Sequence, residues 1–191
     1  MHGHLLWYVA RSAGLVAWAL LALSVGLGVL LSSRMAGRRP SPAWLLSIHR
    51  YLGGLASIFV LVHVFGIVAD TYVHFGVIDI LVPLASSWHP VAVAWGIVAM
   101  YVLVAVELTS LARASLPRSL WRWVHMSSYP LFLLASVHML SAGTDAFSAP
   151  VRALALAGTL GLLALTLVAM VHAGQARTHA GTTPSRTGAR A

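Results

Sequence analysis

Two strongly apolar stretches of the sequence each carry a pair of histidines. His49 and His63 lie 14 positions apart in HRYLGGLASIFVLVH, and His125 and His138 lie 13 positions apart in WVHMSSYPLFLLASVHML. A neutral imidazole nitrogen is a good ligand for iron and other transition metals. Titratable side chains inside such apolar stretches usually serve a function. These four histidines are therefore the first candidates for chemistry.

The surrounding sequence is typical of a membrane protein. Hydrophobic residues make up 59% of the 191 residues and charged residues only 8%, whereas soluble domains carry about 25% charged residues. Five apolar runs approach or exceed the roughly 20 residues that a helix needs to cross a bilayer. They predict an all-α, up-and-down bundle of five transmembrane helices within a domain at 1–173, with the helices at about 6–31, 43–69, 90–111, 120–140 and 151–171.

The rest of the sequence narrows the possible functions. The polar stretch 174–191 is expected to be a disordered cytoplasmic tail. The absence of cysteine excludes disulfides, thiolate metal sites and iron–sulfur ligation. No Gly-rich phosphate loop or dinucleotide fingerprint is present in the sequence, so we expect no flavin or NADPH domain within it.

The arginines predict how the bundle is oriented. By the positive-inside rule, the arginine-rich side of the membrane is cytoplasmic, which places the N-terminus outside and the C-terminus inside. The other side carries Arg11 and Arg152 with three aspartates. We therefore interpret the formal charge of +8 as membrane topology in an inner or plasma membrane, with no nucleic-acid partner. The arginines predicted to be cytoplasmic are Arg34, Arg38, Arg39, Arg50, Arg113, Arg118, Arg122, Arg177, Arg186 and Arg190.

The same topology sorts the histidines by depth. Runs two and four cross the membrane in the same direction, so His49 and His125 share the inner level and His63 and His138 the outer level. At about 1.5 Å per residue, the two levels are roughly 20 Å apart. Two facing pairs at this separation fit two b-type haems, each with two axial imidazoles, one from each helix.

The intervening residues fit this arrangement unevenly. In run two, helical phase places the small residues Gly53 and Ala56, together with Val60, near the face shared by the histidines, where a flat ring needs room. In run four, 13 residues advance a straight helix by roughly 220° beyond whole turns, so the two histidines would face different ways. Pro130 lies between them and predicts a bend. The phase alone does not show whether this bend brings both rings to one side.

Other interpretations of the histidines remain open. They could handle protons or hydrogen-bond neighbouring helices in a non-redox membrane protein, such as a transporter or assembly subunit. Separate zinc or copper sites are a further alternative, although two histidines without an acid or thiolate are a poor ligand set.

Several charged residues near the histidines are candidates for supporting roles. Arg50 and Arg122 are expected to bind cofactor propionates, since a guanidinium fork matches a carboxylate, and simple membrane anchoring is the alternative. Arg11 is a weaker candidate for the same role on the outer side. Glu107 could relay protons or face a quinone, and His89 could contact an external partner.

Three stretches carry a resemblance to a known family. HRYLGG…VH, the LTS at 108–110 and WRWVHMSSYP…VH resemble the ferric reductase-like transmembrane domain, over roughly residues 10–170. This family includes ferric-chelate reductases, NADPH oxidases and the haem-binding subunit of the bacterial periplasmic methionine sulfoxide reductase system. The resemblance implies two b-type haems, with His49 and His125 as ligands of one and His63 and His138 as ligands of the other.

The resemblance also implies an electron-transfer function. In the family, electrons pass from the cytoplasmic side to an acceptor outside, such as ferric iron, oxygen or a partner reductase. The large relatives append a flavin and nicotinamide domain, and short bacterial relatives commonly have six helices where five are expected here. The chain is therefore expected to be an oxidoreductase electron-transfer subunit whose donor is separate, either a flavin reductase using FMN or FAD or a membrane quinol. A quinol-linked anchor subunit is a related alternative.

Overall fold

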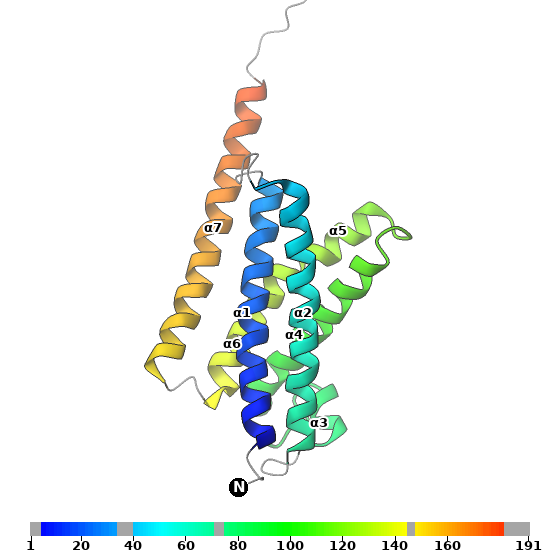
Figure 1. Ribbon diagram of the computed structural model, residues 1–191, viewed down its shortest axis with the longest axis vertical. Coiled ribbons are helices and arrows are strands. Elements are labelled where there is room, and N and C mark those ends of the chain that lie inside the picture. The colour runs from blue at the N-terminus through cyan, green and yellow to red at the C-terminus, as the bar shows by residue number, and fades with distance from the viewer. Residues whose placement is uncertain (1–4, 34–39, 71–74, 145–147, 182–191) are drawn as a thin grey trace, which may run out of the picture.

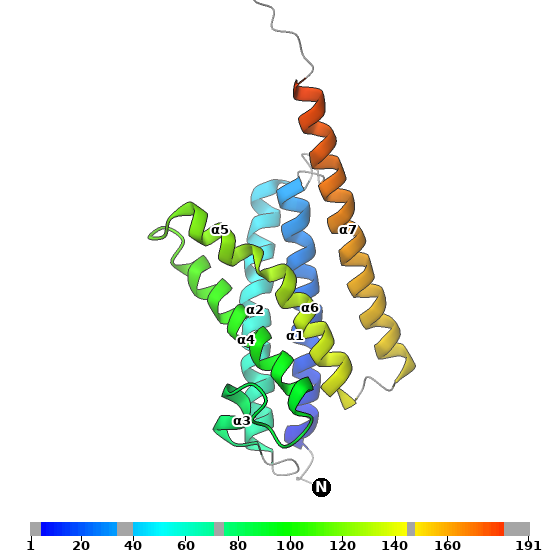
Figure 2. The same cartoon turned by 180° about the vertical axis from the view of Figure 1, so that it is seen from behind.

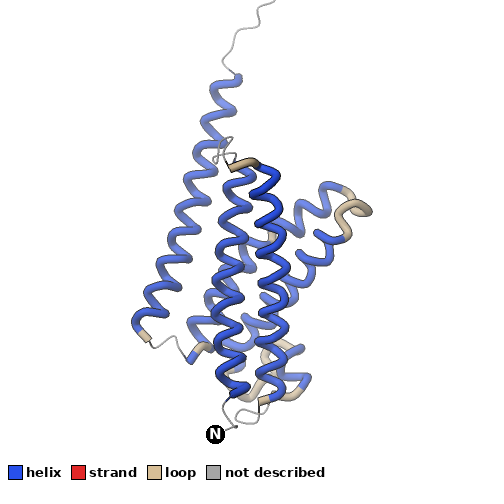
Figure 3. The backbone as a smooth tube through the Cα atoms, viewed as in Figure 1, coloured by secondary structure: helices blue, strands red, loops and turns tan. Residues whose placement is uncertain are grey.

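The computed structural model describes residues 5–33, 40–70, 75–144 and 148–181, and all regular secondary structure among them is helical (Figures 1 and 3). The expected tail begins within this range, yet the last helix continues to Gly181; residues 182–191 lie outside the described part. The helices are α1 (Leu5–Ser33), α2 (Pro42–Ala69), α3 (Val77–Leu81), α4 (Pro90–Leu111), α5 (Arg118–Met126), α6 (Ser128–Ala142) and α7 (Ala149–Gly181).

Four helices are long and apolar enough to cross a membrane: α1, α2, α4 and the segment Ala149–His172 of α7. In a bilayer, a helix satisfies its own backbone hydrogen bonds while its side chains face lipid. Large apolar side chains are accordingly exposed along these helices, for example Leu61 at 69%, Phe65 at 71% and Met170 at 68%. The chain is therefore a multi-span membrane protein.

The predicted helix over 120–140, in which Pro130 indicated a bend, is divided into two helices in the structure. α5 ends at Met126 and α6 begins at Ser128, with Ser127 between them. The ring of Pro130 would clash with the carbonyl of Met126, four residues earlier, so the chain cannot continue through this turn as a regular helix. In α6, Pro130 lies in the first turn, where a missing N–H costs no helical hydrogen bond. Four single-helix spans and a broken fifth segment therefore replace five continuous ones.

Neighbouring helices pack antiparallel in the pairs α1–α2 and α4–α6, whereas α7 runs in the same direction as its neighbour α1 (Figure 1). α1 and α2 lie side by side along their whole length, α4 packs against α6, and α7 lies along the outside of α1 (Figures 1 and 2). Small residues let α1 and α2 approach closely: a Cβ atom at Gly66 would lie 3.0 Å from the Cβ of Ala10. α2 and the α5–α6 segment run in the same direction through the bundle (Figure 1), so the histidines they carry can meet in matched order.

The core lies halfway along the bundle, between the two levels of histidines. It includes Trp18 and Leu21 of α1, Ala56 of α2, and Phe132 of α6. Trp18 donates its indole N–H to Ser136 Oγ at 2.9 Å, so the polar edge of this buried ring is satisfied. The core thus lies between the two levels of histidines, and some of its residues, Trp18, Leu21 and Leu131 among them, also line a cavity on the side of His63 and His138.

Candidate functional site

The outer pair joins α2 to α6. The ring centroids of His63 and His138 lie 6.3 Å apart, with the ring planes at 76° to each other. Each ring donates a hydrogen bond to a backbone carbonyl of another helix. His63 Nδ1 donates to Ala10 O of α1 at 2.7 Å, and His138 Nδ1 donates to Ala92 O of α4 at 2.8 Å. A carbonyl only accepts hydrogen bonds, so the proton of each neutral ring is on Nδ1 and the lone pair is on Nε2.

The inner pair joins α2 to α5. The ring centroids of His49 and His125 lie 5.8 Å apart, with the planes at 77°. His49 Nδ1 donates to Ser24 O at 2.8 Å and lies 3.2 Å from Ser24 Oγ. His125 Nδ1 lies 3.4 Å from Ser110 Oγ, a longer and weaker contact. The inner pair is therefore oriented partly by side chains, whereas the outer pair is oriented by the backbone alone.

The separation of the rings within each pair fits one metal between two imidazoles. A metal–imidazole nitrogen bond is about 2 Å long, which places the centroids of two rings on opposite sides of a metal about 6 Å apart. Nδ1 bonded to a carbonyl or hydroxyl, with Nε2 left as the ligand, is the usual arrangement of a metal-binding histidine. Both pairs have this arrangement.

The donor set indicates which group the pairs fit. Within the described residues no three side chains of the types His, Cys, Asp and Glu gather into one metal-binding cluster. A structural zinc ion normally takes four protein ligands, so two histidines leave a bare ion undersupplied. A haem brings its own four equatorial nitrogens and needs only two axial ligands, which each pair supplies.

Glycines of the neighbouring helices make room for three of the four rings. A Cβ atom at Gly14 would lie 2.9 Å from His63 Nδ1, one at Gly28 would lie 3.4 Å from His49 Cε1, and one at Gly96 would lie 2.7 Å from His138 Cε1. Each glycine is four residues after the carbonyl that accepts from the same ring. One helical turn therefore supplies both the acceptor and the space. These glycines are not predictable from the spacing of the histidines, because they lie on helices other than those of the histidines they face.

The small residues expected to make this room have other neighbours. A Cβ atom at Gly53 would lie 2.9 Å from Glu107 Oε1 and not against a histidine. Ala56 is fully buried in the core between the two levels. Val60 lines the outer cavity, as its phase predicts. Gly53 thus makes room for the carboxylate of Glu107, which lies on α4 near the inner pair.

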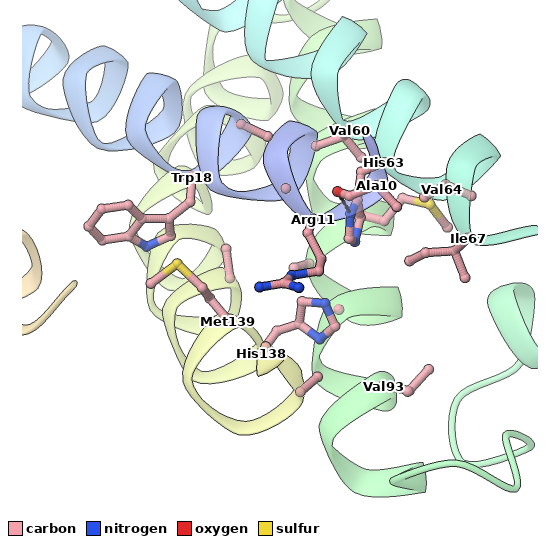
Figure 4. A pocket seen from close by; sticks show the side chains of 18 of the residues that line it. Ala10, Arg11, Trp18, Val60, His63, Val64, Ile67, Val93, His138 and Met139 are labelled. Atoms are coloured by element: carbon pink, nitrogen blue, oxygen red, sulfur yellow. Dashed lines mark hydrogen bonds between the residues drawn. The ribbon is translucent and has the colours of Figure 1, made fainter. Parts of the chain in front are cut away.

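An almost wholly apolar cavity lies at the outer level. Figure 4 shows His63 and His138 entering it from opposite sides, with Val60, Ile67 and Val93 among its walls. Arg11 of α1 also lines it, with its guanidinium in the same space as the histidines. Low polarity and limited water access are conditions under which a protein tunes a redox cofactor. The cavity therefore suits a flat apolar group with a polar edge near Arg11.

The other predicted site residues lie toward the two ends of the bundle. Arg50 is exposed on α2, and Arg122 is one of three arginines around a pocket where α4 meets α5. His89 directly precedes α4 as its N-cap, in a left-handed conformation with φ of 43°, and its ring centroid lies 4.6 Å from that of Trp88. No contact of Arg50, Arg122 or His89 with the four paired histidines is among those described.

The structure defines a helical membrane protein in which two pairs of histidines face each other across the bundle. The sequence matches the family described as ferric reductase like transmembrane component over residues 13–136, and the chain belongs to this family. The matched range includes His49, His63 and His125 and ends shortly before His138. A search of curated proteins found no match. The family membership confirms the resemblance and supports a membrane electron-transfer role.

Proposed function

We propose that the chain is a diheme b-type cytochrome that carries electrons across the membrane. The observation that carries the proposal is the geometry of the two pairs, in which ring centroids lie 5.8 and 6.3 Å apart and every Nδ1 contacts an oxygen of a neighbouring helix. His49 and His125 would hold the inner haem, and His63 and His138 the outer haem. When bound, haem supplies one-electron transfer between its two iron oxidation states.

The protein's own residues orient and insulate these groups. The carbonyls of Ala10, Ser24 and Ala92 fix the tautomer of three histidines and keep Nε2 available as a ligand. The apolar core around Trp18 and Phe132 lies between the two levels and would limit the access of water there. The arginine-rich end would face the cytoplasm, where Arg50 and Arg122 are proposed to neutralise the propionates of the inner haem.

The donor and acceptor are proposed to be separate molecules. A flavin reductase or a membrane quinol would deliver electrons at the arginine-rich end. The opposite end would pass them to an external acceptor, either ferric iron, oxygen or a partner reductase. An acceptor would reach the outer haem through the outer cavity, which lies near α3.

Absorbance spectroscopy of the purified protein tests the proposal. After expression with ample haem, the reduced protein should show the sharp bands of six-coordinate, low-spin haem b, at about two haems per chain. A haem-free protein from haem-sufficient cells would contradict it and would favour a non-redox membrane protein. Five-coordinate, high-spin spectra would keep the cofactor but contradict the paired ligation.

A further inference from the structure

A basic pocket lies where α4 ends and α5 begins. Three arginines surround it, from the loop after α4 and from the first turns of α5. α5 is also strongly amphipathic, with Trp123 exposed at 80% next to the pocket residue Arg122, as expected for a helix at a membrane surface. The lining residues are Arg113, Arg118, Ser119, Trp121 and Arg122.

The three guanidinium groups have no carboxylate partner within the described residues. The whole chain has only four acidic residues. Asp70 and Asp79 belong to the opposite end of the bundle, at the end of α2 and in α3 (Figure 1), and Asp145 follows α6 in the sequence. Glu107 points toward Gly53 of α2.

All three arginines are exposed and lack a carboxylate partner among the described residues. Arg122 is the one proposed above for the inner propionates, so Arg113 and Arg118 are available to bind an anion from solution or from the membrane surface.

The pocket also contains uncharged hydrogen-bond donors besides its three arginines. α5 begins after Pro117 without any side-chain cap, so N–H groups of its first turn are available. Ser119 contributes a hydroxyl group. The indole Nε1–H of Trp121 is buried, and it has no hydrogen-bond partner among the described residues. Buried donors of this kind normally have an acceptor, so the pocket offers more donors than the described chain satisfies.

Trp121 connects this pocket to the inner histidine pair. Its ring stacks on the ring of His125, with centroids 5.0 Å apart and planes at 21°. The guanidinium carbon of Arg113 lies 4.5 Å from the centroid of the same indole. An anion bound beside Arg113 would therefore be separated from His125 only by the indole ring of Trp121.

We propose that this pocket binds a phosphate group and thereby tunes the inner site. Guanidinium forks, a hydroxyl and helix N–H groups are the donors that phosphate oxygens prefer. The phosphate belongs either to an anionic lipid headgroup or to a soluble phosphate ester. The binding site itself stands without the proposed function; its effect on the inner haem rests on that function.

The binding test compares two arginine variants with a matched control. Arg113→Gln/Arg118→Gln removes two pocket charges, and Arg152→Gln removes one exposed charge at the other end of the bundle. Binding of pyrophosphate is measured by calorimetry in uncharged detergent. Binding of phosphatidylglycerol is measured by retention in phosphatidylcholine nanodiscs. We expect the double variant to bind the preferred probe at least about tenfold more weakly than the wild type and the control to bind as the wild type does.

The two probes distinguish the source of the phosphate. Tight retention of phosphatidylglycerol with weak pyrophosphate binding identifies a lipid headgroup, and the reverse result identifies a soluble ester. Unchanged binding in the double variant would overturn the proposal and leave an adventitious ion only. Loss of haem from the double variant with phosphate binding intact would also overturn it, because the arginines would then serve the propionates.

A second measurement tests the connection through Trp121. In the haem-loaded protein, the bound anion should lower the midpoint potential of the inner haem, since negative charge favours the oxidised form, and should leave the outer potential unchanged. Trp121→Phe keeps an aromatic ring against His125 but removes the N–H, and it should weaken phosphate binding severalfold. Phosphate binding without any shift of the inner potential would overturn the tuning role. A chain that binds no haem would contradict only the proposed function, because the calorimetry and nanodisc assays do not need haem.

Discussion

The two histidine pairs have the same ring geometry but different surroundings. At the outer level both rings donate to backbone carbonyls, at 2.7 and 2.8 Å, inside an apolar cavity. At the inner level one ring relies on a serine hydroxyl at 3.4 Å, and an indole and a carboxylate lie close by. The outer site is therefore set by helix packing, and the inner site is open to adjustment by side chains.

This difference suits the proposed direction of electron flow. The inner pair lies near the arginine-rich end, where α4, α5 and the basic pocket gather polar groups. Polar groups and charges near a cofactor change its potential and its coupling to protons. The outer pair has mainly apolar neighbours, so its properties should respond little to the donor side. Substitutions at the two levels should accordingly have separable effects.

The largest effect is expected from removing a ligand. His63→Ala or His138→Ala should lower the haem content to about half while the inner haem stays bound, because each haem needs both axial histidines. His49→Ala or His125→Ala should remove the inner haem instead. Haem per chain and the potential of the remaining haem are measured by absorbance and redox titration. Equal loss of both haems from all four variants would contradict two independent levels.

The second-largest effect is expected from the glycines that lie against the histidine rings, and it should differ between the outer and inner levels. Gly96→Ala places a Cβ 2.7 Å from His138 Cε1, so the ring must move and the outer haem should be lost or weakly bound. Gly28→Ala meets His49 Cε1 at 3.4 Å and should be tolerated better. Gly54→Ala is the control, since nothing lies within 4 Å of its Cβ position. Haem content measures all three. Equal outcomes for Gly96→Ala and Gly54→Ala would show that this close approach does not matter.

The serines should sharpen the comparison at the inner level. Ser110→Ala removes the hydroxyl that contacts His125 Nδ1, and it should weaken inner haem binding about tenfold, as other losses of a ligand's hydrogen-bond partner do. Ser24→Ala leaves the backbone carbonyl that accepts from His49 Nδ1, so its effect should be small. Titration of haem into the haem-depleted variants measures both affinities. A stronger effect at Ser24 than at Ser110 would contradict this order.

The smallest effect is expected from charge. Glu107→Gln removes a carboxylate near the inner pair, and it should raise the inner midpoint potential without changing the outer one, because negative charge stabilises oxidised iron. Spectroelectrochemical titration resolves the two potentials. A shift of the outer midpoint potential alone would contradict the prediction that Glu107 acts on the inner haem.

Much of this arrangement was predictable from local sequence. Long apolar runs require membrane helices, because lipid offers no partners for an open backbone. The direction of successive helices places His49 with His125 and His63 with His138. The break after Met126 was not predicted in full: Pro130 indicated a bend, but a proline in the first turn of a new helix and one inside a bent helix look alike in sequence.

The sequence by itself determined the class of protein and the two levels of histidines, since hydrophobicity and residue spacing act along one chain. Only the tertiary structure decided how each ring is held. The carbonyls of Ala10, Ser24 and Ala92 lie 25 to 53 positions away from the rings that donate to them. The glycines that make room for the same rings, Gly14, Gly28 and Gly96, lie 21 to 49 positions away from them. Every residue has a backbone carbonyl, so the sequence does not show which carbonyl accepts from a histidine. The role of a glycine likewise depends on which side chain of another helix packs against it.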